Sequence, residues 1–208
     1  MFDEHEAESA VVTVGDGRGF VIKHRHDRLV VTAAHCLPRF PPCHGASYLE
    51  ERTYSELLAP LGDDLAEWAE CLFADPIADI AVLGSPDDQE LTEAAEAYEA
   101  LVESATPLSI ADVPAEEFGA FHPHPGFLLS LEGSWFPCII EYIGDGPLLI
   151  SDAAQRIVGG MSGSPILSAE GLAIGVVCLG GNHAANARLA SHLPGWLLRE
   201  PAPVAEDD

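Results

Sequence analysis

Three short segments of the sequence carry side chains that together could perform nucleophilic catalysis. His35 lies in the segment TAAHC, Asp79 in the segment DIAVL, and Ser162 in the glycine-rich segment GMSGSP. Each residue alone has an ordinary explanation, because histidine and aspartate often lie at strand ends, and Gly and Ser favour turns. A catalytic function therefore depends on the fold bringing the three residues together.

Acyl transfer requires these three types of side chain. A serine hydroxyl is a weak nucleophile that needs a neighbouring base, and histidine titrates near neutral pH and can serve as that base. A buried carboxylate then holds the histidine tautomer and balances the imidazolium charge. Glycines beside the serine let backbone N–H groups approach a substrate carbonyl. The residues thus indicate Ser162 as nucleophile, His35 as general base and Asp79 as its orienting partner.

Short strands separated by turns are expected to hold these residues. Apolar or β-branched runs predict strands at 10–14, 20–22, 29–32, 77–83, 127–131, 136–143, 148–150, 166–167 and 172–179. The pattern over 55–69 is looser, and Ser55 could cap a short helix there. Apolar residues recur at helical spacing over 87–104. Many short strands with one helix predict a mostly all-β barrel or sandwich.

Composition and charge exclude several classes of protein. The chain has 208 residues, of which 48% are hydrophobic, so a disordered chain is excluded. No apolar run reaches the roughly 18 residues of a spanning helix, and no leader-like segment opens the sequence. A net charge of -25 repels nucleic-acid phosphates. We expect a cytoplasmic protein with no membrane or nucleic-acid partner, whose acidic surface serves solubility or steers a basic partner.

The cysteines predict no metal or cofactor. They are Cys36, Cys43, Cys71, Cys138 and Cys178. An odd number leaves one thiol unpaired in a monomer, and without a leader we expect reduced, mostly buried cysteines. A Cys36–Cys43 disulfide stays open for an exported chain. A zinc site could be built from Cys36, Cys43 and His44 together with His24 or His26. The spacing of these residues matches no standard structural zinc site.

The order His–Asp–Ser with TAAHC, DIAVL and GMSGSP resembles the chymotrypsin-like serine proteases, particularly their bacterial trypsin-like branch. The segments GRGFVI, SDAA and GVVCLGG extend the resemblance over nearly the whole chain. It implies two six-stranded antiparallel β-barrels with the site in the crevice between them. The expected unit spans residues 1–208, with barrels at about 10–85 and 105–200 and a helical insertion at 86–104.

The resemblance also assigns catalytic roles. Ser162 is the nucleophile, His35 the general base and then acid, and Asp79 its orienting residue. The backbone N–H groups of Gly160 and Ser162 would form the oxyanion hole. Met161 stands where trypsin-type enzymes place an aspartate that receives a new N-terminus, so activation by N-terminal insertion is not expected.

Four further residues are implied to bind substrate. Cys178, Leu179 and Gly180 fall where the family pairs the substrate backbone as an extra strand. Arg156 would lie near the floor of the pocket for the side chain before the scissile bond. A guanidinium there favours an acidic side chain, with small or aliphatic side chains as the alternative. Arg156 could instead pair with Asp152 on the surface.

The function expected from these residues is that of a serine endopeptidase that hydrolyses polypeptides through an acyl-enzyme. A catalytically silent module that binds peptides on the same fold is the alternative, since fold does not guarantee activity. The same three residues could also serve a simple esterase. The oligomeric state is left open.

Overall fold

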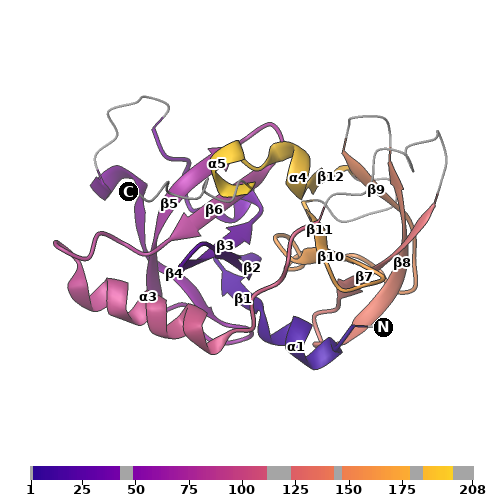
Figure 1. Cartoon of the computed structure of the whole chain (residues 1–208), viewed down its shortest axis with the longest axis horizontal. Coiled ribbons are helices and arrows are strands. Elements are labelled where there is room, and N and C mark those ends of the chain that lie inside the picture. The colour runs from indigo at the N-terminus through magenta and orange to yellow at the C-terminus, as the bar shows by residue number, and fades with distance from the viewer. Residues whose placement is uncertain (1, 43–48, 112–122, 143–146, 179–184, 199–208) are drawn as a thin grey trace, which may run out of the picture.

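Two closed β-barrels lie side by side in the computed structural model (Figure 1). The structure describes residues 2–42, 49–111, 123–142, 147–178 and 185–198. The strands of the first barrel are β1 (Val11–Val14), β2 (Gly17–His24), β3 (Asp27–Thr32), β4 (Thr53–Pro60), β5 (Glu67–Asp75) and β6 (Ile80–Gly84). Those of the second are β7 (His124–Leu129), β8 (Trp135–Tyr142), β9 (Leu148–Ala153), β10 (Pro165–Ser168), β11 (Ala173–Val176) and β12 (Ala185–Arg188). The predicted fold class, two antiparallel six-stranded barrels, is confirmed.

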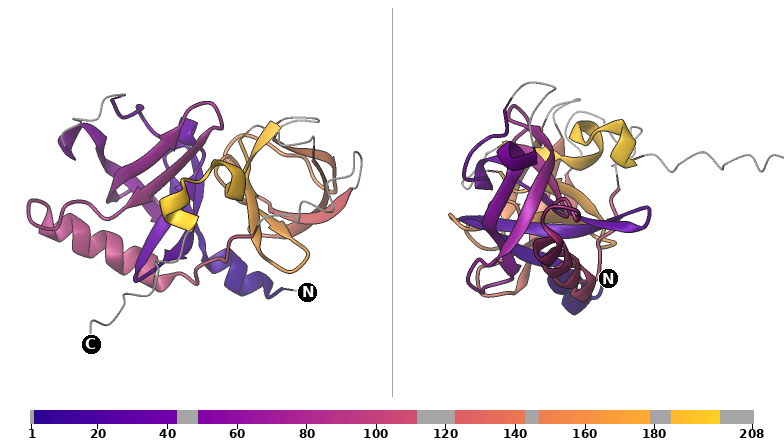
Figure 2. Two further views of the ribbon diagram at one scale, coloured as in Figure 1. Left: turned by 45° about the horizontal axis from the view of Figure 1, so that its top comes forward. Right: turned by 90° about the vertical axis from the view of Figure 1, so that its left-hand side faces the viewer.

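The two barrels share one topology. The first has the strand order β1-β2-β3-β6-β5-β4, and the second has the equivalent order β7-β8-β9-β12-β11-β10. Each barrel closes through its first and fourth strands, β1 with β4 and β7 with β10. The left-hand view of Figure 2 looks into the second barrel and shows its closure. Among the strands that the structure describes, closure leaves no edge strand in either barrel, which removes a template for aggregation.

The segment predicted as irregular, 55–69, is instead part of two strands, so a helix capped by Ser55 is wrong there. Strand β4 pairs with β1 and with β5, and its side chains Tyr54, Leu57 and Leu58 are buried. The pairing register shifts between Tyr54 and Leu58, and Glu56 within this bulge has a φ of 51°. A bulge breaks the alternation of buried and exposed positions, which is the pattern that identifies a strand in a sequence.

The helices lie outside the barrels. They are α1 (Glu4–Ser9), α2 (Leu49–Arg52), α3 (Thr92–Ser104), α4 (Leu189–His192) and α5 (Gly195–Leu198). The predicted helix over 87–104 is present but begins at Thr92. Residues before it form a turn, in which the Asp87 side chain accepts from the backbone of Gln89 at 2.8 Å. This side-chain bond offers the backbone an alternative to the helical pattern.

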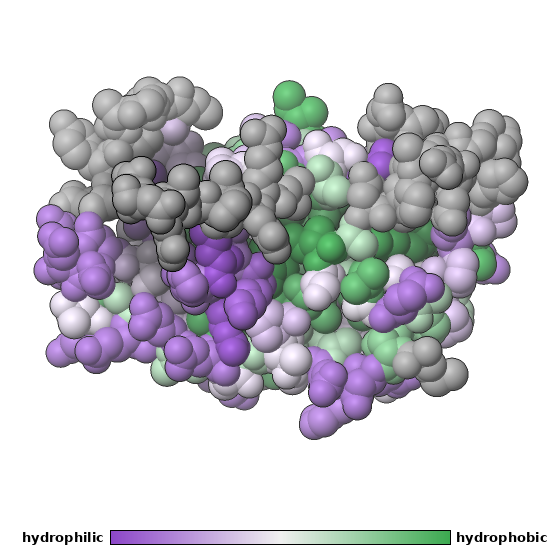
Figure 3. Space-filling model, in the orientation of Figure 1, coloured by the Kyte–Doolittle hydropathy of each residue, from purple (hydrophilic) through white to green (hydrophobic). Residues whose placement is uncertain are grey.

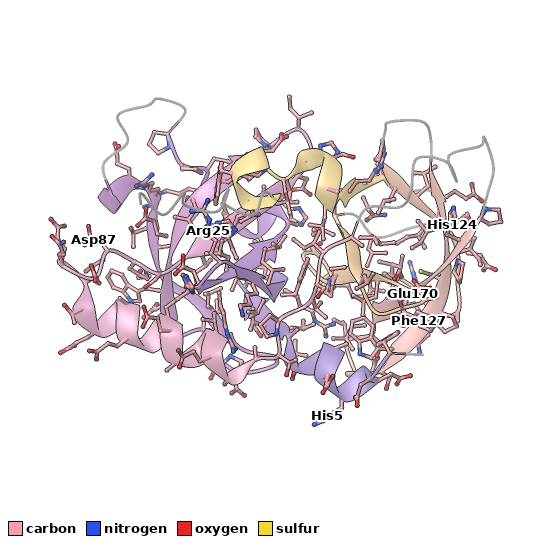
Figure 4. All side chains as sticks on the ribbon, viewed as in Figure 1. His5, Arg25, Asp87, His124, Phe127 and Glu170 are labelled. Atoms are coloured by element: carbon pink, nitrogen blue, oxygen red, sulfur yellow. The ribbon has the colours of Figure 1, made fainter. Side chains whose placement is uncertain are left out.

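Both ends of the described chain join the two barrels. The Phe2 ring, just before α1, makes edge contacts with Phe127 of β7 and Trp135 of β8. His5 projects from α1 away from the barrels (Figure 4). At the other end, α5 follows the second barrel but crosses to the first, where the Leu197 carbonyl lies 3.1 Å from the His24 ring. The two barrels are thus tied together on both sides of their boundary.

The surface is polar over α3 and more apolar near the boundary between the barrels. In Figure 3 hydrophilic residues cover the lower left of the molecule, where α3 lies, and hydrophobic residues gather near the middle of the same face. In the described segments, no helix has the length and apolar character that crossing a bilayer demands.

Candidate functional site

His35 and Asp79 are paired through two hydrogen bonds. His35 lies in a 3-10 turn, η1 (Ala34–Cys36), which follows β3. Its Nδ1 lies 2.7 Å from Oδ2 of Asp79, and its backbone N–H donates to Oδ1 at 2.9 Å. A carboxylate at Nδ1 places the proton on that nitrogen and leaves Nε2 free to accept one. The His35 side chain is 45% exposed, so a substrate can reach the ring.

Asp79 has an unusual backbone that suits this pairing. It directly precedes β6 and has a φ of 58°, in the left-handed region, which aspartate tolerates better than most residues. In this conformation its carbonyl also accepts from the backbone N–H of Ala34 at 3.2 Å. Main chain and side chain of Asp79 therefore both bind the η1 turn. Positive φ in a residue other than glycine often marks a functional position.

Ser162 is held at the boundary of the two barrels. Its carbonyl accepts from the backbone N–H of Arg18 in β2 at 2.7 Å, and the next residue, Gly163, donates to Val177 of the second barrel at 2.7 Å. Gly163 has a φ of 83°, and a Cβ atom there would lie 1.7 Å from the Arg18 carbonyl oxygen. Glycine is thus required after the serine. The Ser162 hydroxyl lies 3.5 Å from the Cys178 carbonyl, a long and weak hydrogen bond.

The turn before Ser162 leaves two backbone donors free. Met161 donates to Val158 at 3.3 Å, and Gly160, the third residue of this turn, has a φ of 89°. Within the described residues, neither Gly160 nor Ser162 donates its backbone N–H to another group. An oxyanion hole needs unbonded backbone donors of this kind beside the nucleophile.

Met161 anchors this turn by burial. Its side chain is 1% exposed and packs in the hydrophobic core of the second barrel, and its sulfur lies 3.5 Å from the Val158 backbone N–H. An apolar side chain therefore fixes the residue before the serine.

Two free thiols line the boundary between the barrels at this site. The Cys36 sulfur lies 3.8 Å from the Ser162 carbonyl, and the Cys178 sulfur lies 3.5 Å from the Asp79 carbonyl. Burial raises the pKa of the Cys36 thiol to about 11 and that of Cys178 to about 12. Both thiols thus stay protonated and pack as small apolar groups. A Cβ atom at Gly17 would lie 2.7 Å from the Cys36 sulfur, so the neighbouring position that a cysteine partner could take holds a glycine.

The implied substrate-binding residues are only partly described. Arg156 is exposed and lines a cavity of about 570 Å³ formed by residues 150–157. Among the described side chains, Arg156 forms no ion pair, so the alternative pairing with Asp152 is not made. Cys178 lies two residues beyond β11, with its carbonyl facing the serine hydroxyl. Leu179 and Gly180 lie outside the described residues.

A zinc site cannot be assembled from the part of the chain that is described, where no three metal-ligating side chains cluster. Cys43 and His44 lie outside that part. His24 lies against Leu197 and Trp196 of the last helix. The four described cysteines, Cys36, Cys71, Cys138 and Cys178, are all buried and unpaired.

The sequence interpretation missed Arg18. This residue of β2 is 5% exposed and donates from Nη1 to the carbonyls of Leu129 and Ser130 in the second barrel. The one signal in the sequence is an arginine within the otherwise apolar segment GRGFVI. A buried arginine needs acceptors, which only another element of the fold can supply here.

Comparisons with known proteins agree with this architecture. A serine protease of human pathogenic astrovirus matches with a TM-score of 0.55 and 16% identity over 90% of this chain and 94% of that one. Deg5 matches with a TM-score of 0.55 and 16% identity over 90% and 87%. The Rv3671c protease in its inactive form matches with a TM-score of 0.52 and 20% identity, over 89% of this chain and 86% of that one. At such identities the likeness establishes the fold.

No curated protein matches the sequence. The model of one family does match: the trypsin-like peptidase domain fits residues 17–176, well over half of the chain. These residues include both strands that flank η1, Asp79 and the turn at Ser162. The chain belongs to the trypsin-like peptidase family.

Proposed function

We propose that this protein is a serine endopeptidase in which Ser162, His35 and Asp79 form the catalytic triad. The observation that carries the proposal is the double hydrogen bond from His35 to Asp79, at 2.7 and 2.9 Å, at the same barrel boundary that holds Ser162. An orienting carboxylate on Nδ1 is what a catalytic histidine requires. We further propose that the chain acts as a single peptidase unit on polypeptides.

The reaction follows from these groups. Ser162 Oγ attacks the substrate carbonyl carbon while Nε2 of His35 takes the hydroxyl proton. The resulting oxyanion accepts hydrogen bonds from the backbone N–H groups of Gly160 and Ser162. The C–N bond then breaks, and His35 returns the proton to the leaving amine. Water attacks the acyl-enzyme by the same route and frees Ser162.

One rearrangement precedes the first step. The Ser162 hydroxyl must leave the Cys178 carbonyl and donate to Nε2 of His35. A hydrogen bond of 3.5 Å is weak, so its loss costs little. Catalytic hydrogen bonds often tighten only when the substrate binds. If this exchange never occurs, the protein is the silent peptide-binding module instead.

The acyl part of the substrate would bind on the side of Cys178. We propose, from the resemblance to the chymotrypsin-like proteases, that a peptide paired with that segment presents its side chain to the cavity that Arg156 lines. The guanidinium carries no ion pair with a described residue, so it is available to a carboxylate of the substrate. We propose a preference for an acidic side chain before the scissile bond, with small or aliphatic side chains as the competing class.

Labelling by a fluorophosphonate probe, which reacts with activated serines, tests the proposal. Wild type should label, and Ser162→Ala, His35→Ala and Asp79→Asn should each lose about 10⁴-fold or more in rate, because the triad acts as one unit. Combining two of these changes should add little to either one alone.

The matched control for this test is Ser164→Ala. Ser164 lies in the same loop, is fully buried, and its hydroxyl has no hydrogen-bond partner among the described residues. This variant should label like the wild type. A folded wild type that does not label would support the silent binding module, and labelling of Ser162→Ala would refute the assignment of the nucleophile.

A further inference from the structure

Arg18 joins the two barrels beside the nucleophile. Its backbone N–H donates to the Ser162 carbonyl at 2.7 Å, while its own carbonyl accepts from the Thr32 hydroxyl at 2.6 Å. Its side chain crosses the boundary, and Nη1 donates to Leu129 at 3.1 Å and to Ser130 at 3.0 Å. One residue of the first barrel thus holds both the serine and the end of β7.

The carbonyls that Arg18 binds begin the turn between β7 and β8. That turn closes on itself, because Ser130 donates to Ser134 at 2.9 Å and Gly133 donates to Ser130 at 3.2 Å. Its exposed Leu131 side chain borders the space beside Gly160, because a Cβ atom added there would lie 3.5 Å from it and both residues line the same pocket. The β7–β8 turn therefore lies directly against the turn that supplies the oxyanion donors.

The guanidinium is well suited to hold this turn. Burial lowers the pKa of Arg18, while Glu132 and Glu8 act in the opposite direction. An arginine stays protonated at any physiological pH and so remains a donor. Arg18, Leu131 and Gly160 also line one pocket of about 310 Å³. Arg18 and the turn that contains Gly160 therefore border the same pocket.

We propose that Arg18 is a positioning residue for the oxyanion hole: its guanidinium fixes the β7–β8 turn, and Leu131 of that turn keeps Gly160 in place. The inference rests on the proposed function. It assigns no contact between Arg18 and the substrate. Removing the guanidinium would let the β7–β8 turn shift, and displacements of about 1 Å near a reacting centre can cost about 100-fold in rate.

The test compares Arg18→Met with Arg28→Met. Arg28 is a matched control, because its Nη1 also donates to backbone carbonyls, those of Val102, Glu103 and Ala105, but at the end of α3. Fluorophosphonate labelling gives the maximal inactivation rate and the half-saturating probe concentration separately. In Arg18→Met the maximal rate should fall about 10- to 100-fold with the half-saturating concentration within about 2-fold. In Arg28→Met neither should change.

Hydrogen exchange supplies a second readout. Amides of residues 157–163 should exchange faster in Arg18→Met than in Arg28→Met. Both variants are measured at the same number of degrees below their own melting temperatures. Arg18→Lys, which keeps a charged donor, should label at a rate between wild type and Arg18→Met. If Arg18→Met does not fold, Arg18→Lys is compared with Arg28→Lys by maximal labelling rate and by exchange at residues 157–163.

Two results would overturn the inference. One is a maximal labelling rate in the Arg18 variant less than about 5-fold below that of its Arg28 counterpart. The other is equal exchange at 157–163 in both variants. Neither result would affect the proposed function, which fails only if folded wild-type protein does not label.

Discussion

The Asp79 carboxylate holds the His35 ring and the His35 main chain at once. Oδ1 accepts the backbone N–H and Oδ2 faces Nδ1, so the ring cannot turn without breaking this geometry. In Asp79→Asn, Oδ1 can still accept the backbone bond, but the amide nitrogen would replace Oδ2. A donor at that position favours the opposite tautomer and removes the proton acceptor at Nε2. The variant should therefore keep its fold and lose its reactivity.

Arg156 decides the proposed specificity at the level of one side chain. We expect wild type to cleave peptides with Asp or Glu before the scissile bond faster than matched peptides with Ala, Leu or Arg there. Arg156→Ala should reduce the rate on the acidic peptides by about 10-fold or more, because the substrate carboxylate loses its charged, bidentate hydrogen-bond partner. Values of kcat/KM for the matched peptides provide the measurement.

Gln155→Ala is the control for this specificity, because Gln155 lines the same cavity without a charge. It should leave the order of the five peptides unchanged. Preference of the wild type for Arg, or an unchanged order in Arg156→Ala, would show that Arg156 does not contact that side chain.

At the scale of elements, α3 acts as a support for the first barrel. It packs against β3 and β5, and its Tyr98 hydroxyl lies 3.1 Å from the Arg28 carbonyl and 3.2 Å from the Leu83 carbonyl. Tyr98 is 1% exposed, and the opposite face of α3 carries exposed glutamates. The helix therefore buries one tyrosine-centred face and leaves the other to solvent.

Tyr98→Phe tests this supporting role. The change removes the single hydroxyl proton that the Arg28 and Leu83 carbonyls share and should lower the free energy of unfolding by about 0.5–1.5 kcal/mol. Labelling by the fluorophosphonate should stay at the wild-type rate, because α3 contributes no residue to the site. Urea unfolding measures the first quantity. Glu96→Gln, on the exposed face, should change the free energy of unfolding by less than about 0.5 kcal/mol, and a loss of labelling in Tyr98→Phe would argue against a purely supporting helix.

The elements also show where local sequence signals are sufficient. The apolar and β-branched runs of β1 and of the buried end of β3, residues 29–32, predict strands because they lie in the core of the first barrel. The sequence pattern does not predict β4, because its bulge at Glu56 breaks the alternation of buried and exposed side chains. Its extended conformation depends on pairing with β1 and β5. The helical spacing of its apolar residues predicts α3. Its first residue is set by the preceding turn, in which the Asp87 side chain accepts from the backbone of Gln89.

At the scale of the whole molecule, the buried thiols limit stability in alkali. Burial raises the pKa from the ordinary value of 9.0 to about 11 for Cys36 and Cys71 and to about 12 for Cys138 and Cys178. The unfolded chain releases these protons near pH 9, whereas the folded chain keeps them. Their contribution to stability is therefore complete below pH 9 and is lost as the pH rises toward 11 and 12.

We expect the free energy of unfolding to fall steeply between pH 9 and 10.5, with each thiol contributing a slope of about 1.4 kcal/mol per pH unit. Cys138→Ala should reduce that slope by one thiol's share, whatever its effect on stability at pH 7. Val177→Ala in the same core has no titrating group and should leave the slope unchanged. Urea unfolding at a series of pH values measures the slopes, and equal slopes in all three proteins would contradict the assignment.

The sequence by itself determined the fold class and the candidates for catalysis. Short apolar runs and glycine-rich turns specify strands locally, and TAAHC, DIAVL and GMSGSP each carry their chemistry within a few residues. Such features are visible because they depend on neighbours in the chain. Tertiary structure was not needed to name His35, Asp79 and Ser162.

Only the tertiary structure decided how those residues meet. The pairing of His35 with Asp79 joins residues 44 positions apart, and the bonds from Arg18 to the second barrel span 111 and 112 positions. No periodicity records such a distance, because the partner of a buried donor is set by how the two closed barrels pack. The same physical reason explains why the contacts of the Arg18 side chain and the place of the Cys36 and Cys178 thiols at the boundary became evident only in three dimensions.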